Sequence, residues 1–302
     1  GRWRPRAVFD WGALREILPF SLHLFGFNMV NYWMANLDNL LVGKVLSSHA
    51  LGIYSRAYSL MLLPVTHLTR VIARVMFPVM SRLQGQESLS QRSYLKATRL
   101  IAFFSFPLML GLLVGADLFV GVIYGPRWLP VIPILRIFCL IGMVHSVGST
   151  TGWIYTSSGR TDIQFRWGLF VGVTRMAAIV VGLRWGLRGV AIAYAVATYA
   201  ILWAPSWMIA GRIIGLRFRR MTANLAPSLG CALIMTLALQ LLRRPLAALP
   251  SSPLQLLLLA ASGAVLYIAL NHFFRVGTWK ELLSLAREVK SGRRRERERH
   301  ER

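Results

Sequence analysis

Acidic residues are scarce in this chain. Its 302 residues include 35 Lys and Arg but only 11 Asp and Glu, which gives a formal net charge of +24. An excess of this kind is common in nucleic-acid-binding proteins, but here the basic residues do not form patches interleaved with aromatic residues. They gather in short segments between long apolar runs, as in the loops of a membrane protein. We therefore expect no nucleic-acid partner.

Cysteines and catalytic motifs are also rare or missing. The two cysteines, Cys139 and Cys231, both fall inside apolar runs, which argues against a disulfide framework or a metal site. The sequence holds no Ser/His/Asp set, no Cys/His metal spacing and no glycine-rich phosphate loop. The longest internal segment between apolar runs, about 80–99, is too short for a catalytic domain. We expect neither an enzyme nor a cofactor.

Charge is nearly absent from the apolar runs. The chain is 55% hydrophobic and 15% charged, with a mean hydropathy of +0.52. A membrane-spanning helix needs about 20 apolar residues, whereas barrel strands alternate over about 10. This pattern predicts an all-α polytopic membrane protein with about eight transmembrane helices. The runs are Leu18–Val42, Ala57–Phe77, Leu100–Val120, Val131–Thr156, Trp167–Leu183, Val190–Gly211, Ala223–Leu242 and Pro253–Phe274.

The loops between these runs predict an orientation. Basic residues are more frequent in cytoplasmic loops, so the face with more Lys and Arg is expected to lie inside. The segments 1–15, 82–99, 160–166, 212–220 and the basic tail all fall on one face. We therefore expect both termini in the cytoplasm of a multi-pass protein. Arg243 and Arg244 are the exception, because this arrangement places them outside.

One arginine lies deep in its run. Arg175 has about eight uncharged residues on each side, which is on the order of 12–13 Å of helix. A charge at that depth costs at least ~2.5 kcal/mol, so Arg175 should face a wet cavity or a partner. We expect it to contact an anionic cargo, because the sequence suggests no carboxylate at the same level. The alternative is that it bonds backbone carbonyls at a helix break, or polar groups such as Thr174 and Ser149.

The second run carries several basic residues on one side. Arg56, His67, Arg70 and Arg74 fall within about 60° of one another on a helix. One interpretation is a basic stripe that lines a cavity. The other is that the arginines near each end of the run extend to the membrane surface. Pro64 lies between them and can bend the helix.

Asp38 lies near the end of the first run. If the first two runs form a hairpin about Ser47 and Ser48, Asp38 comes near Arg56, and we expect an ion pair between them. The alternative is a carboxylate that couples transport to protons or sodium.

Small and polar residues inside the runs are interpreted as packing features. Gly168/Gly172, Gly182/Gly186 and Gly211/Gly215 have a spacing that allows helices to approach closely. The polar patch that begins at His145 in the fourth run predicts hydrogen bonds between helices.

Several short stretches resemble a known family. They are Asp38–Gly43, Ala50–Ser55, Phe77–Pro78, Tyr124–Trp128 and Leu183–Ala193. Together they are similar to the C-terminal bundle of Wzx-type polysaccharide flippases, in the multidrug/oligosaccharidyl-lipid/polysaccharide exporter superfamily. The resemblance covers roughly Trp11 to Gly215.

The resemblance implies an architecture. Such proteins have two six-helix bundles around a central cavity, often followed by two further helices. Residues 18–215 would form the second bundle and residues 216–275 the two additional helices. Residues 1–17 would be a cytoplasmic segment, and residues 276–302 an interfacial helix, centred on Gly277–Lys290, with a basic cytoplasmic tail. The first bundle is missing and the chain begins with Gly1, so we expect the C-terminal portion of a longer transporter.

The resemblance also implies a function. It is the translocation of an undecaprenyl-pyrophosphate-linked oligosaccharide across the bacterial inner membrane, for surface or exopolysaccharide synthesis. The implied partners are the lipid-linked oligosaccharide, membrane lipids, and polysaccharide polymerase and assembly proteins. The candidates for binding the cargo diphosphate are Arg175, Arg70, Arg74 and His67, because arginine binds phosphate in a bidentate manner.

Two other functions stay open. An antiporter of small organic cations in the same superfamily would need buried carboxylates, and Asp38 is the one plausible candidate. The second alternative function is a membrane scaffold for polysaccharide assembly that does not transport.

Overall fold

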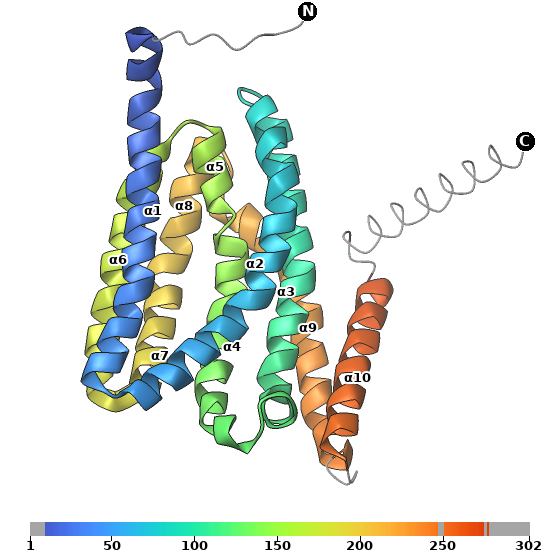
Figure 1. Ribbon diagram of the computed structural model, residues 1–302. Coiled ribbons are helices and arrows are strands. Elements are labelled where there is room, and N and C mark those ends of the chain that lie inside the picture. Colours follow the sequence, from blue (N-terminus) through green and yellow to red (C-terminus); the bar gives the residue numbers. More distant parts are fainter. Residues whose placement is uncertain (1–9, 247–250, 275–276, 278–302) are drawn as a thin grey trace, which may run out of the picture.

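The computed structural model describes residues 10–246, 251–274 and 277, and within these residues the chain is helical throughout (Figure 1). The interfacial helix and tail expected beyond Gly277, and residues 1–9, lie outside the described residues. The helices are α1 (Trp11–Val45), α2 (Ser48–Arg82), α3 (Glu87–Ile123), η1 (Pro126–Val131), α4 (Ile132–Gly148), α5 (Thr151–Ser157), α6 (Thr161–Gly182), η2 (Leu183–Trp185), α7 (Gly186–Val196), η3 (Ala197–Leu202), α8 (Trp203–Ile213), α9 (Phe218–Leu246) and α10 (Ser252–Phe273).

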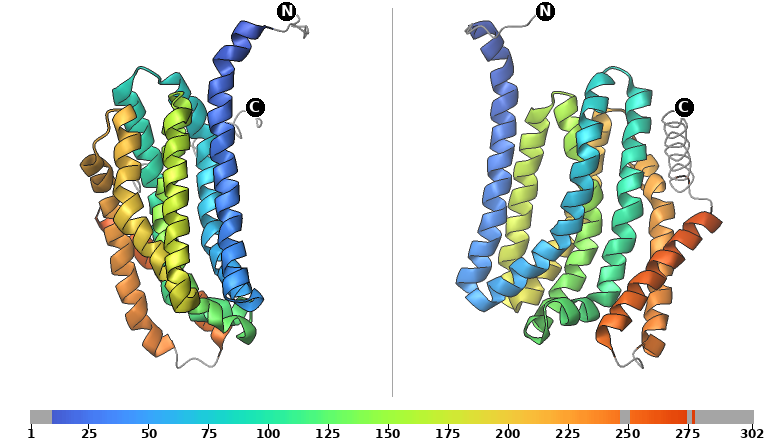
Figure 2. Two further views of the ribbon diagram at one scale, coloured as in Figure 1. Left: turned by 90° about the vertical axis from the view of Figure 1, so that its left-hand side faces the viewer. Right: turned by 45° about the vertical axis from the view of Figure 1, so that its right-hand side comes forward.

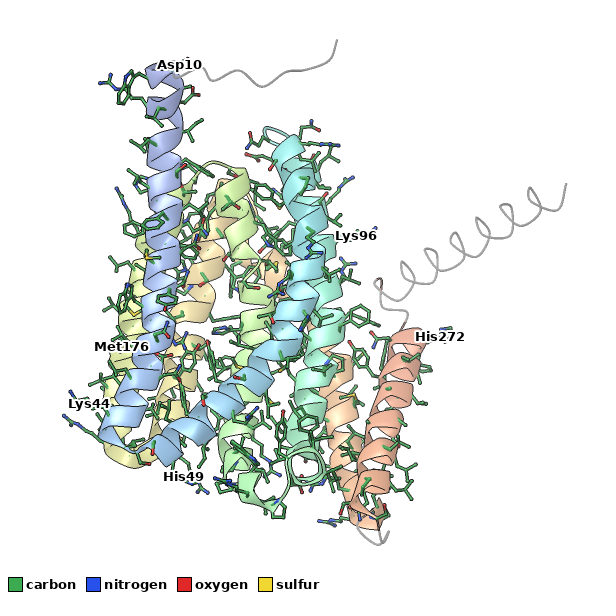
Figure 3. The ribbon with its side chains drawn as sticks, viewed as in Figure 1. Asp10, Lys44, His49, Lys96, Met176 and His272 are labelled. Carbon is green, nitrogen blue, oxygen red and sulfur yellow. The ribbon has the colours of Figure 1, made fainter. Side chains whose placement is uncertain are left out.

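The long helices run lengthwise through the molecule, and the chain reverses direction between one lengthwise pass and the next (Figure 1). Figure 3 places Asp10 at one end of α1 and Lys44 and His49 at the other. Each of the eight predicted apolar runs lies within one lengthwise pass, with α4 and α5 forming one pass and α7, η3 and α8 another. The prediction of an all-α polytopic membrane protein is confirmed.

Six helical stretches within the described residues are long and apolar enough to cross a membrane. One of them, Thr161–Ile213, contains both the fifth and the sixth predicted runs. The first run, in α1, is not among the six.

Side-chain caps fix where two of the longest helices begin. The Asp10 carboxylate accepts hydrogen bonds from the backbone N–H groups of Gly12 and Ala13, and the Ser47 hydroxyl accepts one from Ala50. Such caps satisfy donors that have no partner inside the helix. The hairpin expected about Ser47 therefore forms.

Two of the lengthwise passes are irregular near the middle of the bundle. The fourth breaks at Ser149 and Thr150, between α4 and α5. The sixth contains a π-helical turn, Ala197–Leu202, between α7 and α8. Turns of this type are frequent at functional sites.

Glycines bring α6 close to its neighbours. A Cβ at Gly168 would lie 2.5 Å from the Phe27 ring of α1, and one at Gly182 would lie 2.7 Å from the Gly189 carbonyl of α7. The packing interpretation holds for these two. It is wrong for Gly186, where nothing lies within 4 Å of the Cβ position and where φ is +69°, a region that favours glycine. Gly215 has a φ of +67°, and a Cβ there would also lie 2.9 Å from the Glu87 carboxylate.

The last two helices lie on one side of the bundle. α9 packs against α3, and α10 packs against both α9 and α3 (Figure 2). α1 and α6 form the opposite side. The core of the bundle therefore lies between the pair α9 and α10 and the pair α1 and α6.

Candidate functional site

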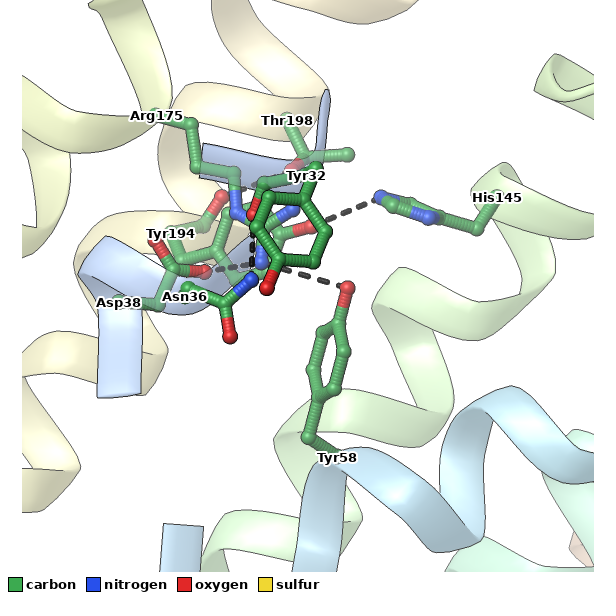
Figure 4. A network of polar contacts seen from close by, with 8 residues as sticks. All are labelled: Tyr32, Asn36, Asp38, Tyr58, His145, Arg175, Tyr194 and Thr198. Carbon is green, nitrogen blue, oxygen red and sulfur yellow. Dashed lines mark hydrogen bonds and ion pairs between the residues drawn. The ribbon is translucent and has the colours of Figure 1, made fainter. Parts of the chain in front are cut away.

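A buried ion pair lies at the centre of the most polar part of the bundle. Nη2 of Arg175 on α6 donates to Oδ2 of Asp38 on α1, and to the hydroxyl of Tyr58 on α2 at 3.3 Å (Figure 4). The side chains are 12% and 2% exposed. The carboxylate therefore compensates the arginine charge where water has little access.

Aromatic rings complete the surroundings of Arg175. Its guanidinium carbon lies 4.6 Å from the ring centre of Tyr194 and 5.3 Å from that of Tyr58. Ring faces attract cations, and the attraction strengthens when the pair is shielded from water. The Tyr194 hydroxyl lies 2.8 Å from Nε2 of His145 on α4. The network thus joins α1, α2, α4, α6 and α7.

The ion pair predicted between Asp38 and Arg56 is wrong. Arg56 instead lies over two aromatic rings, 5.3 Å from the centre of Tyr124 and 4.9 Å from that of Trp128. The expectation that no carboxylate lies at the level of Arg175 is also wrong. α1 packs along α6, and this contact brings Asp38 to Arg175.

The two charges meet because α1 extends beyond its apolar run. α1 continues to Val45 and α6 ends at Gly182, at the same end of the bundle (Figure 1). Asp38 and Arg175 each lie seven residues before these ends. Counted from the end of the apolar run at Val42, Asp38 seemed much nearer the surface.

Arg175 lines a cavity, as its depth predicted. Its volume is about 560 Å³, and residues from α1, α4, α5, α6, α7 and α8 surround it. Asn31, Ser149 and Trp203 are among the lining residues. The cavity therefore combines one compensated charge with neutral polar and aromatic side chains.

The basic stripe of α2 is separate from this network. His67, Arg70 and Arg74 are all exposed, and none of them forms an ion pair with another described residue. Arg56 belongs to the same helix but contacts aromatic rings near its beginning. The structure thus keeps three of the predicted basic residues together on one exposed face and assigns Arg56 and Arg175 elsewhere.

A second charged cluster was not predicted as a unit. Asp117 on α3 accepts a hydrogen bond from Arg243 on α9 and lies 3.7 Å from Arg136 on α4. Arg243 also donates to the Val114 carbonyl at 2.9 Å. The cluster joins α9 to the rest of the bundle. The signal in the sequence was an acidic residue inside an apolar run, which demands a partner.

The polar patch in the fourth run does form hydrogen bonds between helices. The hydroxyls of Ser146 and Ser105 are 2.9 Å apart, and those of Thr150 and Tyr94 are 2.8 Å apart. Both bonds join the α4–α5 region to α3, so this part of the prediction is confirmed.

An apolar groove lies on the other side of α2. It has a volume of about 810 Å³ and runs between α2, α3, α9 and α10, lined by residues such as Leu63, Phe104 and Ile268.

Comparisons with known proteins agree with this architecture. Residues 1–133 match the family described as polysaccharide biosynthesis protein. The chain is 30% identical over 213 residues to the teichuronic acid biosynthesis protein TuaB of Bacillus subtilis, covering 69% of this chain and 44% of TuaB. It is 29% identical to the lipopolysaccharide biosynthesis protein WzxC of Escherichia coli, covering 60% of this chain and 37% of WzxC. The chain resembles Wzx-type polysaccharide biosynthesis proteins.

This resemblance extends to a solved structure. The lipid II flippase MurJ, in an inward closed conformation, superposes with a TM-score of 0.68 at 16% identity. The match covers 89% of this chain and 55% of MurJ, and it shows a shared fold. The chain thus spans less than half the length of TuaB and WzxC and about half that of MurJ.

Proposed function

We propose that this chain forms one bundle of a transporter that moves an undecaprenyl-pyrophosphate-linked oligosaccharide across the bacterial inner membrane. Within it, residues 18–215 act as the bundle and residues 216–275 as two additional helices. The relatives are named for polysaccharide biosynthesis, and a structural neighbour is named as a lipid II flippase. These names support a transporter that moves a lipid-linked saccharide over an enzyme that converts it.

The observation that carries the proposal is the exposed basic face of α2. His67, Arg70 and Arg74 are exposed and have no acidic partner among the described residues. Charged side chains at membrane depth avoid lipid and face protein or water. This face therefore suits the wall of a central cavity, where guanidinium groups replace the water around a diphosphate.

The apolar groove and the basic face suit the two ends of a lipid-linked molecule. Both adjoin α2, since Leu63 and Pro64 line the groove and Arg70 lies farther along the same helix. A cation cargo is less consistent with these features, because Asp38 already pairs with Arg175.

The proposal is tested by removing the positive charge from α2. In cells that need this protein for polysaccharide export, R70Q/R74Q should lower surface polysaccharide and increase the lipid-linked oligosaccharide left in the cytoplasmic leaflet. A hydrogen bond to a charged group contributes ~1.5–3 kcal/mol, so the loss should be at least about tenfold.

Two controls separate charge from folding. R70K/R74K keeps the charge without bidentate geometry and should retain part of the export. R92Q removes an exposed arginine of another helix, α3, and export should stay normal. Wild-type export by R70Q/R74Q, at normal abundance in the membrane, would show that the basic face does not bind the cargo.

A further inference from the structure

The cavity beside Arg175 has a lining that is unusual for the interior of a helical bundle. Aromatic side chains surround it, including Trp153, Trp167 and Trp203, together with neutral polar side chains that include Asn31, Thr156 and Ser206. Arg175 and His145 are the basic residues among its lining. Because Asp38 compensates Arg175, the cavity does not offer a free positive charge.

Four buried polar atoms of the lining lack a hydrogen-bond partner. One is Nε of Arg175, and the three neutral ones are Oε1 of Gln164, the hydroxyl of Tyr155 and Nε1 of Trp207. Gln164, Tyr155 and Trp207 are 5%, 1% and 3% exposed, so bulk water does not reach their side chains freely. Leaving a buried polar atom without a partner costs ~1–3 kcal/mol. The neutral atoms are an acceptor, a hydroxyl that can both donate and accept, and a donor, so a ligand that satisfies all three must both donate and accept.

Two neighbouring polar side chains of the lining do have hydrogen-bond partners. Nε1 of Trp167 donates to the Ser206 hydroxyl at 3.2 Å, and the Thr156 hydroxyl donates to the Gly152 carbonyl at 2.8 Å. The unpartnered atoms are therefore specific positions at which a ligand in the cavity could form hydrogen bonds.

We infer that this cavity binds one sugar unit of the transported oligosaccharide. A pyranose ring has hydroxyl groups that both donate and accept, and faces of C–H groups that pack on aromatic rings. A volume of about 560 Å³ falls within the usual range of small-molecule sites, ~300–1,000 Å³. The inference rests on the proposed function and adds that the head of the cargo is recognised inside this bundle, apart from the basic face that holds its diphosphate.

The test measures protection of single cysteines in the full protein, in a C139A/C231A background. Ser149 lies at an exposed position of the cavity lining, and Val71 lies on the basic face of α2, 66% exposed. S149C and V71C are each reacted with a maleimide in the presence of lipid-linked oligosaccharide extracted from the cells that make the polysaccharide. A second sample of the same extract is first treated with mild acid, which cleaves the sugar from the lipid phosphate, and the released water-soluble sugar is then washed out.

We expect the intact extract to slow labelling of S149C at least about fivefold and the acid-treated extract to leave it unchanged. V71C should be protected by both. The Q164L variant should lose the protection of S149C and keep that of V71C. The matched control Q86L, at an exposed glutamine outside the cavity, should change neither.

Each other result decides between the two proposals. Protection of V71C without protection of S149C would overturn the sugar site and leave the proposed function intact. Equal protection of S149C by both extracts would mean that the lipid phosphate enters the cavity, and would overturn the sugar site. Protection of neither cysteine by intact extract would overturn the proposed function together with the sugar site.

Discussion

At the scale of single residues, the bundle accommodates Arg175 because groups from several helices share its charge. Asp38 supplies the counter-charge, Tyr58 accepts a hydrogen bond, and the Tyr194 ring covers the guanidinium at 4.6 Å. Removing one partner from a buried pair is much more costly than removing both, because the remaining charge is left without compensation.

This asymmetry gives the first prediction. D38N and R175Q should each destabilise the protein by ~3–5 kcal/mol, the usual cost of breaking a buried pair. The double variant D38N/R175Q should recover a large part of the loss. The measurement is the temperature at which the monodisperse protein in detergent is half lost on heating.

The exposed pair of Arg160 and Asp162, with 3.2 Å between Nε and Oδ1, provides the control. D162N should shift the midpoint little, because exposed pairs contribute ~0–1 kcal/mol. Losses from D38N and R175Q that add up in the double variant would contradict the pairing.

The sequence identified Arg175 but not its partner. Its depth could be read from the length of uncharged helix on each side, and that depth requires compensation. The partner lies 137 positions away in the chain, on a helix whose contact with α6 no local pattern reveals. Arg56 seemed the natural partner because it is near in sequence, but its surroundings are the rings of Tyr124 and Trp128.

At the scale of helices, close approach of α6 and α7 depends on glycine. A Cβ at Gly182 would lie 2.7 Å from both the Gly189 carbonyl oxygen and the Val190 Cα. These are backbone atoms, which cannot rotate away as a side chain can. The α6–α7 turn also helps to position the polar network around Arg175, since Arg175 lies before this turn and Tyr194 after it.

The second prediction follows from this contact. G182A should destabilise the protein by ~1–3 kcal/mol, because the added methyl group forces the two helices apart. G111A, on α3, is the matched control: nothing lies within 4 Å of the position of its Cβ. Alanine there should be neutral or slightly stabilising, since it favours helix over glycine. If G182A unfolds at the same temperature as G111A, the helices are not held by this contact.

Helices were predictable in number because apolar runs of about 20 residues have few alternatives in a membrane. Their irregular parts were not. The break at Ser149 and the π turn at 197–202 lie inside uninterrupted apolar or neutral sequence, where periodicity gives no sign of them. Both border the cavity, so the features most relevant to the site were those that local sequence indicates least.

At the scale of the whole molecule, basic residues are distributed unequally between the two ends of the bundle. The last turns of α2 and α8 carry Arg82 and Arg212, and Arg217 follows α8, at the end of the bundle where Figure 3 labels Asp10. Arg243 and Arg244, at the other end, were the exception to the expected orientation. Arg243 donates hydrogen bonds to Asp117 and to the Val114 carbonyl, so it has partners inside the bundle.

The last prediction concerns orientation in the membrane. We expect both termini in the cytoplasm, because the end of the bundle with more Lys and Arg should lie inside. Ser48 begins α2 and Ser158 follows α5, and these positions lie at opposite ends of the bundle (Figure 1). In a C139A/C231A background, S48C should react with a membrane-impermeant thiol reagent added to intact cells, and S158C should react only after the membrane is opened. The two cysteines replace serines that are at least partly exposed, so neither change disturbs the core. Labelling of S158C and not S48C in intact cells would reverse the orientation, and the basic face near Arg74 would then lie toward the outer leaflet, where a cargo made in the cytoplasm would leave rather than enter.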